Sequence, residues 1–332
     1  MASEKAAVQT TEKKENFESV IIRSFLNLEK IDVDLYSRSK MLWQPQGGRA
    51  VFGGQVVGQA LAAASYSVPS DHNAHSLHCY FLRPGNYKIP ILYLVDRTRD
   101  GQTYVGRNIK AMQEGQAIFT MQASFKREEK DPFSHQFKMP DVPPPEQCVD
   151  LDKLLIKAIG PEKARLYRYG VRHRMPDDVM AIHRRLADKT DYYVTRPSSA
   201  RRCIWIKAAG HLGDDHKMHQ CCAAYMSDAM LLGTATLPYT GSHAEAQEKM
   251  FMTSIDHTVW FHSTFRADDW LLYEMESPVC GEGRGYNTGR MWTRDGRLAI
   301  SVAQEGVVRT RRTDRSTLLT QTADPLTSKS KL

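Results

Sequence analysis

The sequence predicts an α+β protein built from two similar units, and three observations lead to this fold class. A spaced pattern of histidine, glycine–arginine and glutamine occurs twice, over 78–122 and again over 262–304. In each half a helix-like segment precedes strand-like segments that are separated by turn residues. A proline-rich stretch lies between the halves. Repetition of this length indicates one supersecondary unit used twice, and helices segregated from antiparallel strands are typical of α+β folds.

The first unit is predicted over residues 17–130. It begins with a short amphipathic helix and a strand within 17–37, and an alanine-rich helix follows over about 54–68. Because that helix contains no charged residue, we expect it to be buried on nearly all sides. Turn residues such as Glu114-Gly115 then separate four predicted strands, which cover 75–83, 88–98, 103–113 and 116–126.

The second unit is predicted over residues 151–312, after a linker at 131–150. The linker contains Pro140-Asp-Val-Pro-Pro-Pro, which excludes a helix interior or a central strand. Within the second unit we predict a strand at 203–208 and a helix at about 216–233. The later strands are predicted over 250–266, 270–277, 284–293 and 297–310. The polar residues 313–332 are predicted to be a disordered tail.

The composition is that of an ordinary globular protein. Hydrophobic residues make up 41% of the 332 residues and no apolar run could span a bilayer, so we expect no stable membrane insertion. The net charge is +7, but the basic residues are scattered and form no recognisable binding module, which argues against a nucleic-acid partner. Residues 1–15 lack a signal-peptide core. The six cysteines form no C-x-x-C pair, which favours free thiols in a reducing compartment.

Asp228 is the first candidate for chemistry, because it lies inside the predicted helix over 216–233 among apolar residues. A carboxylate on such a face needs a hydrogen-bonding or ionic partner. Asp228 is therefore either a structural residue bonded to a backbone amide or an arginine, or a functional acid. The first unit's helix contains no acid, which favours function. Helical spacing places four neighbours beside it: Ala224, Tyr225, Leu231 and Leu232.

Ser254 and Gln304 are the next candidates. A serine at the start of a strand-like run is ordinarily a turn or edge residue, whereas a glutamine in an apolar strand needs partners for its amide. Because Gln122 has the matching place in the first repeat, we predict that Gln304 makes a hydrogen bond that the fold requires in both halves. His257 and His262 are possible bases, but on a strand rich in tryptophan and phenylalanine we expect packed, structural histidines.

No standard metal or cofactor motif is present, and we expect neither a metal nor a cofactor. The glycine-rich segment at Gly281 is followed by strand-like sequence, which does not fit a dinucleotide-binding fingerprint. One further group of side chains resembles a metal cluster, but its spacing fits no standard site. Its members are His211, Asp214, Asp215, His216 and His219.

Four segments together resemble the acyl-CoA thioesterase II family, in order, over roughly residues 17–310. They are Phe52-Gly-Gly-Gln-Val-Val-Gly-Gln-Ala-Leu, His75-Ser-Leu-His-Cys-Tyr-Phe-Leu-Arg-Pro-Gly, Asp256-His-Thr-Val-Trp-Phe-His and Gln304-Glu-Gly-Val-Val-Arg. The resemblance implies a tandem, or double, hot-dog fold, in which an antiparallel sheet wraps a central helix in each unit. It implies hydrolysis of fatty acyl-CoA to a free acid and CoA. It also implies three catalytic residues, namely Asp228, Ser254 and Gln304.

These residue types suit thioester hydrolysis. Asp228 would deprotonate or polarise a water that Ser254 and Gln304 hold in line, while backbone N–H groups near a helix N-terminus would bind the oxyanion. A covalent intermediate on Ser254 is disfavoured, because no histidine–acid pair activates it. Two alternatives stay open at this point: a non-catalytic acyl-CoA-binding hot-dog protein and a hydratase-type hot-dog enzyme acting on enoyl-CoA.

The last three residues, Ser330-Lys331-Leu332, match a peroxisomal import address. With the resemblance, they predict the peroxisomal matrix as the location and the import receptor as a partner besides the acyl-CoA substrate. A homodimer is possible, as is a monomer. Because Asp228 and Ser254 have no counterpart in the first repeat, we expect one catalytic centre per chain.

Overall fold

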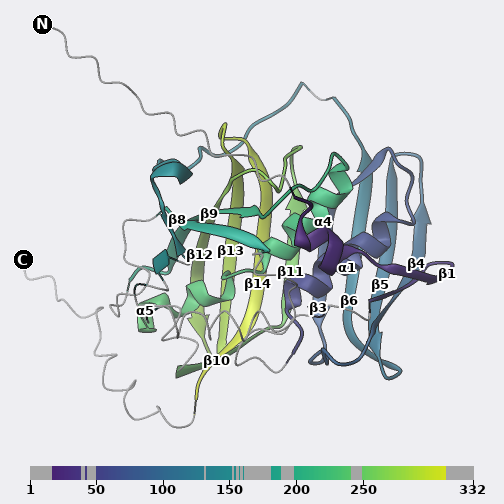
Figure 1. Cartoon of the computed structure of the whole chain (residues 1–332), viewed down its shortest axis with the longest axis horizontal. Coiled ribbons are helices and arrows are strands. Elements are labelled where there is room, and N and C mark those ends of the chain that lie inside the picture. The colour runs from purple at the N-terminus through teal and green to yellow at the C-terminus, as the bar shows by residue number, and fades with distance from the viewer. Residues whose placement is uncertain are drawn as a thin grey trace, which may run out of the picture.

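The computed structural model contains one large antiparallel sheet that curves around two central helices (Figure 1). Its strand order is β1-β2-β4-β5-β6-β3-β11-β14-β13-β12-β9-β8-β7, and β10 pairs with β14. No helix in the described part of the chain is long and apolar enough to cross a membrane. The structure describes residues 17–38, 42, 50–130, 132–151, 153, 154, 157, 160, 181–187, 198–240 and 249–311.

The described part of the first half contains a central helix and six strands. The four strands expected after the helix are present, but the segment within 17–37 forms a π-helix and a hairpin instead of a helix and one strand. The predicted turn at Glu114-Gly115 joins β5 to β6 with positive φ at both residues, as a two-residue hairpin turn requires. The elements are η1 (Ile21–Leu26), β1 (Glu29–Asp32), β2 (Leu35–Arg38), α1 (Gly53–Ser65), β3 (His72–Phe81), β4 (Ile91–Asp100), β5 (Tyr104–Gln113) and β6 (Gln116–Arg127).

In the described part of the second half, two predicted elements differ from the structure. The helix expected over 216–233 ends at Ser227, and the strand expected over 250–266 is two strands separated at Ile255. The elements are β8 (Ile182–Leu186), β9 (Arg201–Ala208), α4 (His216–Ser227), η3 (Leu232–Thr236), α5 (Leu237–Thr240), β10 (Met250–Ser254), β11 (Asp256–Phe261), β12 (Leu271–Gly281), β13 (Arg284–Thr293) and β14 (Leu298–Thr310).

The central helices α1 and α4 lie against each other at positions where α1 has glycine. A Cβ atom at Gly54 would lie 2.3 Å from the carbonyl oxygen of Tyr225, and one at Gly58 would lie 2.9 Å from that of Cys221. These distances are shorter than van der Waals contact, so only glycine permits the approach. As expected from its lack of charge, α1 is buried from Gly54 to Ser65.

The two halves are joined through β3 and β11, which pair with each other in the middle of the sheet. This seam has Thr258 opposite His78 and Val259 opposite Leu77. The sheet is therefore continuous across both halves. Helix α1 contacts strands of its own half, whereas α4 contacts β11 of its own half and β3 of the first half.

The segment between the halves lies on the outer face of the second half. The indole N–H of Trp205 donates to the carbonyl of Pro143, and a turn (η2, Pro145–Gln147) leads into the short edge strand β7 (Val149–Asp150) beside β8. We call residues 132–148 the strap. Three of its side chains pack on a second apolar cluster outside the main core, which contains Ala187, Trp205, Trp270, Leu272 and Trp292; they are Met139, Val142 and Cys148.

The two halves do repeat one arrangement of strands. However, the residues that correspond in the structure are not those matched in the sequence. Phe81 and Phe261 both end a strand, and the residues that follow them, Leu82 and His262, donate their N–H groups to the carbonyls of Ile118 and Ala299. Leu82 therefore corresponds to His262. The sequence frame, which matched His78 with His262, was wrong.

This register places Gln122 and Gln304 on opposite faces of the sheet. Gln304 pairs with Asn287, whereas Ala123, the residue after Gln122, pairs with Arg107 in the equivalent strands. Gln122 is exposed and Gln304 is fully buried. The expectation of one shared, fold-level hydrogen bond is wrong, because a shift of one residue moves a strand side chain to the other face.

Candidate active site

Asp228 caps the C-terminal end of α4 and does not lie inside a helix. Its backbone still has helical angles (φ −79°, ψ −13°), but α4 ends at Ser227. Met230 adopts a positive φ of 70°, which turns the chain away from the helix axis. Leu231 and Leu232 are therefore not helical neighbours of Asp228, contrary to the sequence prediction.

The carboxylate of Asp228 lies at the N-terminus of α1. Its Oδ2 accepts a hydrogen bond of 2.8 Å from the backbone N–H of Gly54, one of the first-turn N–H groups that a helix leaves unpaired. The charge therefore lies at the positive end of the α1 dipole. A Cβ atom at Gly53 would be 2.8 Å from the same oxygen and 3.0 Å from the ring of Phe81. Only glycine fits this approach.

Ser254 and Gln304 meet the same carboxylate from two paired strands. Ser254 ends β10 opposite Gly306 of β14, and Gln304 lies two residues earlier in β14, on its inner face. Gln304 Nε2 donates to Asp228 Oδ1 at 2.6 Å and to Ser254 Oγ at 3.0 Å. Ser254 Oγ lies 3.4 Å from Asp228 Oδ1. The structure thus brings all three predicted residues together.

These contacts fix the orientation of the Gln304 amide. Both N–H bonds of the Gln304 amide are used, one toward Asp228 and one toward Ser254, so its Oε1 points away from them. The Ser254 oxygen accepts from Gln304, which leaves the hydroxyl hydrogen free to point to Asp228 or to a bound molecule. Acceptors and a rotatable O–H are thereby presented at one point, a combination that can hold a water molecule.

His257 lies close to this cluster but is fully buried. Its Nε2 is 2.8 Å from Ser227 Oγ. Burial lowers the pKa of the imidazole, and the nearby charge of Asp228 only partly opposes this effect. His262 instead faces the outer side of the sheet, where its Nε2 bonds Ser301 Oγ at 2.8 Å. His257 is packed, as expected from the sequence, whereas His262 is exposed.

Two residues beside the cluster of Asp228, Ser254 and Gln304 were not identified from the sequence. The backbone N–H of Gly54 has no side-chain signal beyond the Gly53-Gly54 pair that opens α1. Asn287 lies beside Gln304 in β13 and is fully buried, but its sequence surroundings Gly285-Tyr-Asn-Thr-Gly are not distinctive. Neither residue could be recognised without the strand pairing and the helix contact.

Comparisons with known proteins bear on both halves of the chain. Residues 174–307 match the family described as acyl-CoA thioesterase, and residues 41–126 match the acyl-CoA thioesterase N-terminal domain. The chain is 46% identical over 295 residues to acyl-coenzyme A thioesterase 8 of Rattus norvegicus, which covers 88% of this chain and 90% of the relative. It is 36% identical over 292 residues to acyl-CoA thioesterase 2 of Haemophilus influenzae, with 86% and 95% covered.

The chain belongs to the acyl-CoA thioesterase family. A crystal structure of the acyl-CoA thioesterase II TesB2 from Mycobacterium marinum matches with a TM-score of 0.69 and 34% identity over 88% of this chain and 99% of that one. A hot-dog protein from Alicyclobacillus acidocaldarius matches with a TM-score of 0.68 at 18% identity, over 87% and 98%, and supports the fold alone. The predicted double hot-dog fold, family and enzyme class are confirmed.

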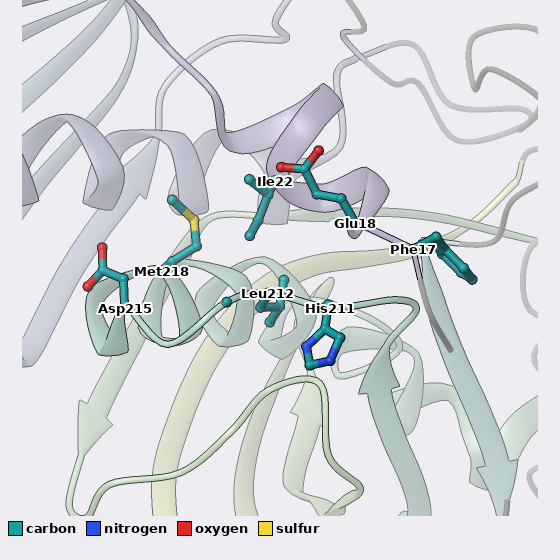
Figure 2. A pocket seen from close by; sticks show the side chains of 8 residues that line it. Phe17, Glu18, Ile22, His211, Leu212, Asp215 and Met218 are labelled. Carbon is teal, nitrogen blue, oxygen red and sulfur yellow. The ribbon is translucent and has the colours of Figure 1, made fainter. Parts of the chain in front are cut away.

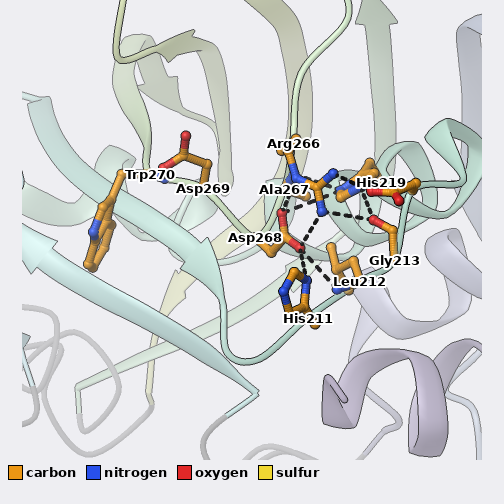
Figure 3. A network of polar contacts seen from close by, with 10 residues as sticks. His211, Leu212, Gly213, His219, Arg266, Ala267, Asp268, Asp269 and Trp270 are labelled. Carbon is orange, nitrogen blue, oxygen red and sulfur yellow. Dashed lines mark hydrogen bonds and ion pairs between the residues drawn. The ribbon is translucent and has the colours of Figure 1, made fainter. Parts of the chain in front are cut away.

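Three members of the histidine and aspartate group near α4 of this thioesterase, His211, Asp214 and His219, belong to a network of polar contacts (Figure 3). Arg266 pairs with Asp214 and Asp268, and Asp268 also accepts the N–H of Leu212 at 3.0 Å. His219 donates through Nε2 to the carbonyl of Gly213 and accepts the Ala267 N–H on Nδ1. Within the described residues, no group of three or more histidine, cysteine or acidic side chains is arranged to hold a metal.

A pocket of about 580 Å³ lies beside the N-terminal end of α4, between η1 and the loop before the helix (Figure 2). It is far from the cluster of Asp228, because α4 has 12 residues and therefore spans about 18 Å. We do not include it in the candidate active site. Its lining residues are Phe17, Glu18, Ile22, His211, Leu212, Gly213, Asp215 and Met218.

Proposed function

We propose that this thioesterase hydrolyses fatty acyl-CoA at a centre formed by Asp228, Ser254 and Gln304. The observation that carries the proposal is the Gln304 amide, which bonds both of the other side chains within 3.0 Å. The three residues come from the end of α4 and from two paired strands, and they converge beside the N-terminus of α1. A buried amide whose two donors serve an acid and a hydroxyl is a suitable holder for a reactive water.

In the proposed reaction, the carboxylate of Asp228 accepts a proton from a water that Ser254 and Gln304 orient. The water oxygen attacks the thioester carbonyl carbon, and the carbon–sulfur bond breaks. The departing CoA thiolate takes the proton, so the products are a free fatty acid and CoA. A carboxylate acting as general base in this way contributes on the order of 10²- to 10⁴-fold to the rate.

The oxyanion formed in this attack needs hydrogen-bond donors. In the first turn of α1, the N–H of Gly54 is bonded to Asp228 and those of Gln55 and Val56 to the carbonyl of Phe52. The N–H of Gly53 remains as the donor for the oxyanion, and the positive end of the helix dipole lies at the same place. Gly53 is the first residue of α1. Because glycine has no Cβ, its N–H can be approached beside Asp228 Oδ2 and the ring of Phe81. Preorganised donors of this kind stabilise developing negative charge without reorganisation.

Among the residues that the structure describes, the first half has no equivalent centre. In the structural register, Ala74 lies opposite Phe125 as Ser254 lies opposite Gly306, and Ala123 corresponds to Gln304. Alanine can neither accept nor donate through its side chain. This difference supports one catalytic centre per chain, as we expected from the sequence.

The test is release of free thiol from a panel of acyl-CoAs by wild type and Asp228→Asn, which keeps the side-chain shape but removes the charge. We expect a fall in kcat of at least about 100-fold. Asp256→Asn is the matched control, because Asp256 is also a half-buried acid that accepts one backbone N–H, from Glu305 at 2.8 Å. Equal rates for wild type and Asp228→Asn would reject the site. No thiol release by wild type with any chain length would favour the acyl-CoA-binding alternative.

We propose that the protein works in the peroxisomal matrix, imported through a receptor that binds Ser330-Lys331-Leu332. This tripeptide lies outside the described residues. The proposal is supported by the tripeptide and by 27% identity, over 80% of this chain and 87% of the relative, to peroxisomal acyl-coenzyme A thioester hydrolase 1 of Saccharomyces cerevisiae. Deletion of Leu332 should leave a tagged protein in the cytosol; continued import would contradict the assignment.

We also propose that the chain divides into a unit at 17–130, a linker at 131–150, a second unit at 151–312 and a tail at 313–332. As a separate point, we propose that two copies of the chain form a homodimer. The change from β6 to the strap near residue 130 supports the first boundary. Sedimentation of the full chain would measure the assembly, and a purely monomeric protein would contradict the dimer.

A further inference from the structure

The last turn of α4 is held by three buried contacts at Ser227, the residue immediately before Asp228. The phenolic O–H of Tyr273, in β12, donates to the carbonyl of Ser227 at 2.6 Å. Ser227 Oγ donates to the carbonyl of Ala224 at 2.9 Å and lies 2.8 Å from His257 Nε2. Ser227, His257 and Tyr273 are all fully buried. Ser227, at the end of the helix, is therefore bonded to the sheet through both its backbone carbonyl and its side chain.

The direction of the His257 bond follows from these partners. The Ser227 hydrogen is donated to Ala224, so the imidazole carries its hydrogen on Nε2 and donates it to Ser227 Oγ. Burial lowers the pKa of His257, which keeps the ring neutral near neutral pH. A neutral ring with a fixed tautomer is a rigid support and does not compete with Asp228 for a proton.

The first half shows that the fold does not require a histidine here. Counting back from the matched Phe81 and Phe261, the counterpart of His257 is Leu77, which is equally buried. Tyr93 is the counterpart of Tyr273, and its hydroxyl donates to the side chain of Gln59 in the middle of α1 and not to a helix end. The contacts at Ser227 therefore occur in the half that contains Asp228.

We infer that Ser227, His257 and Tyr273 are positioning residues that fix the carboxylate of Asp228 against Gln304 and the N-terminus of α1. The last turn of a helix lacks the next turn that would hold it and opens readily. Here it must keep the 2.6 Å contact to Gln304 while Met230 turns the chain away. This inference rests on the proposed catalytic role of Asp228.

Two tyrosines provide a matched test. Tyr273→Phe and Tyr93→Phe each remove one buried hydroxyl that donates to a central helix, and both side chains are fully buried. We expect a similar fall in melting temperature for both. Only Tyr273→Phe should lower kcat, by about 10-fold or more, with KM within about twofold, because misplacement of a reacting group reduces turnover more than binding.

The histidine is tested with a pair of substitutions. His257→Leu installs the side chain type found at Leu77, and we expect kcat to fall by about 10- to 100-fold with little change in KM. His257→Gln retains an N–H donor and should recover much of the loss. Ser227→Ala combined with His257→Leu should be no worse than His257→Leu alone, because both changes remove the same contact.

The outcomes separate this inference from the proposed function. If Asp228→Asn is inactive while Tyr273→Phe keeps wild-type kcat, the positioning role is rejected and the active site stands. An equal loss of kcat in Tyr93→Phe would also reject it, because the effect would then be general loss of packing. If His257→Leu does not fold, the tyrosine pair still decides. Full activity of Asp228→Asn would reject the proposed function itself.

Discussion

At the scale of single residues, the face of the strand on which a side chain lies decides its role. Gln304 is buried against Asp228, while Gln122, which the sequence pattern matched with it, is exposed on the outer side of the sheet. The three residues that lie together at the candidate site were identified in the sequence through resemblance to the family. The register could not be predicted, because strand residues one position apart face opposite directions.

The two glutamines therefore make a direct comparison. Gln304→Ala removes both donors that hold Asp228 and Ser254, and we expect kcat for acyl-CoA hydrolysis to fall by about 100-fold. Gln122→Ala removes an exposed amide and should leave kcat unchanged. Thiol release by the two purified variants measures the difference. Comparable losses in both variants would mean that Gln304 acts only through the stability of the sheet.

At the scale of helices and loops, the contact between α1 and α4 places the C-terminal end of α4, with Asp228, beside the N-terminal end of α1, with Gly54. Gly54 allows the backbones to meet and also donates its N–H to Asp228. The existence and burial of α1 followed from its uncharged, alanine-rich sequence. The end of α4 could not be predicted in this way, because apolar residues continue past Ser227. The chain leaves the helix at Met230 through a positive φ, which the pattern of side chains does not reveal.

Gly54→Ala tests this contact. Alanine in a helix interior is ordinarily about 1 kcal/mol more favourable than glycine, but a Cβ here would lie 2.3 Å from a backbone oxygen. We expect the free energy of unfolding to fall by about 1–3 kcal/mol, as in other overpacked sites. We also expect the rate of acyl-CoA hydrolysis to fall. Gly106→Ala is the control, because its nearest contact would be an ordinary 3.7 Å from Arg99. Urea denaturation of both variants measures the difference.

Asp268, in the loop between β11 and β12, gives a prediction on pH. Burial raises the pKa of Asp268, but hydrogen bonds from Arg266 and the Leu212 N–H, with the charges of His219 and Arg266, outweigh it and hold the pKa below its usual range. Because the pKa of this carboxyl is lower in the folded state than in the unfolded state, the ionised carboxylate stabilises the fold at any pH above the unfolded-state pKa of about 3.9. This stabilisation is lost as the pH falls through the folded-state pKa. Asp268→Asn should therefore be less stable than wild type at neutral pH, and the difference should shrink below about pH 4. A difference in melting temperature that does not change with pH would contradict this.

At the scale of the whole molecule, the strap makes the two outer faces unequal. Leu272 is fully buried in the cluster that the strap covers, whereas Leu92, its counterpart in the first half, is 41% exposed. The prolines showed that the segment between the halves is neither a helix nor a central strand. Its docking on the second half could not be predicted, because it depends on tryptophans that are distant in the sequence.

Trp205 connects the strap to the sheet, and its replacement measures what that docking contributes. Trp205→Ala should lower the free energy of unfolding by about 3–5 kcal/mol, because it leaves a cavity and removes the bond to Pro143. Trp260→Ala should cost much less, since that side chain is 37% exposed on the outer face of β11. Equal losses would show that the strap does not stabilise the second half.

The seam between β3 and β11 has a consequence for how the chain is made. The edge of β3 leaves the ribosome long before β11 exists, and at about 5–20 residues per second the delay is on the order of ten to forty seconds. During this time the hydrogen-bonding edge of β3 and the glycine side of α1 have no partner, and unpaired strand edges readily join other chains. The nascent first half therefore has to be shielded until its own second half arrives.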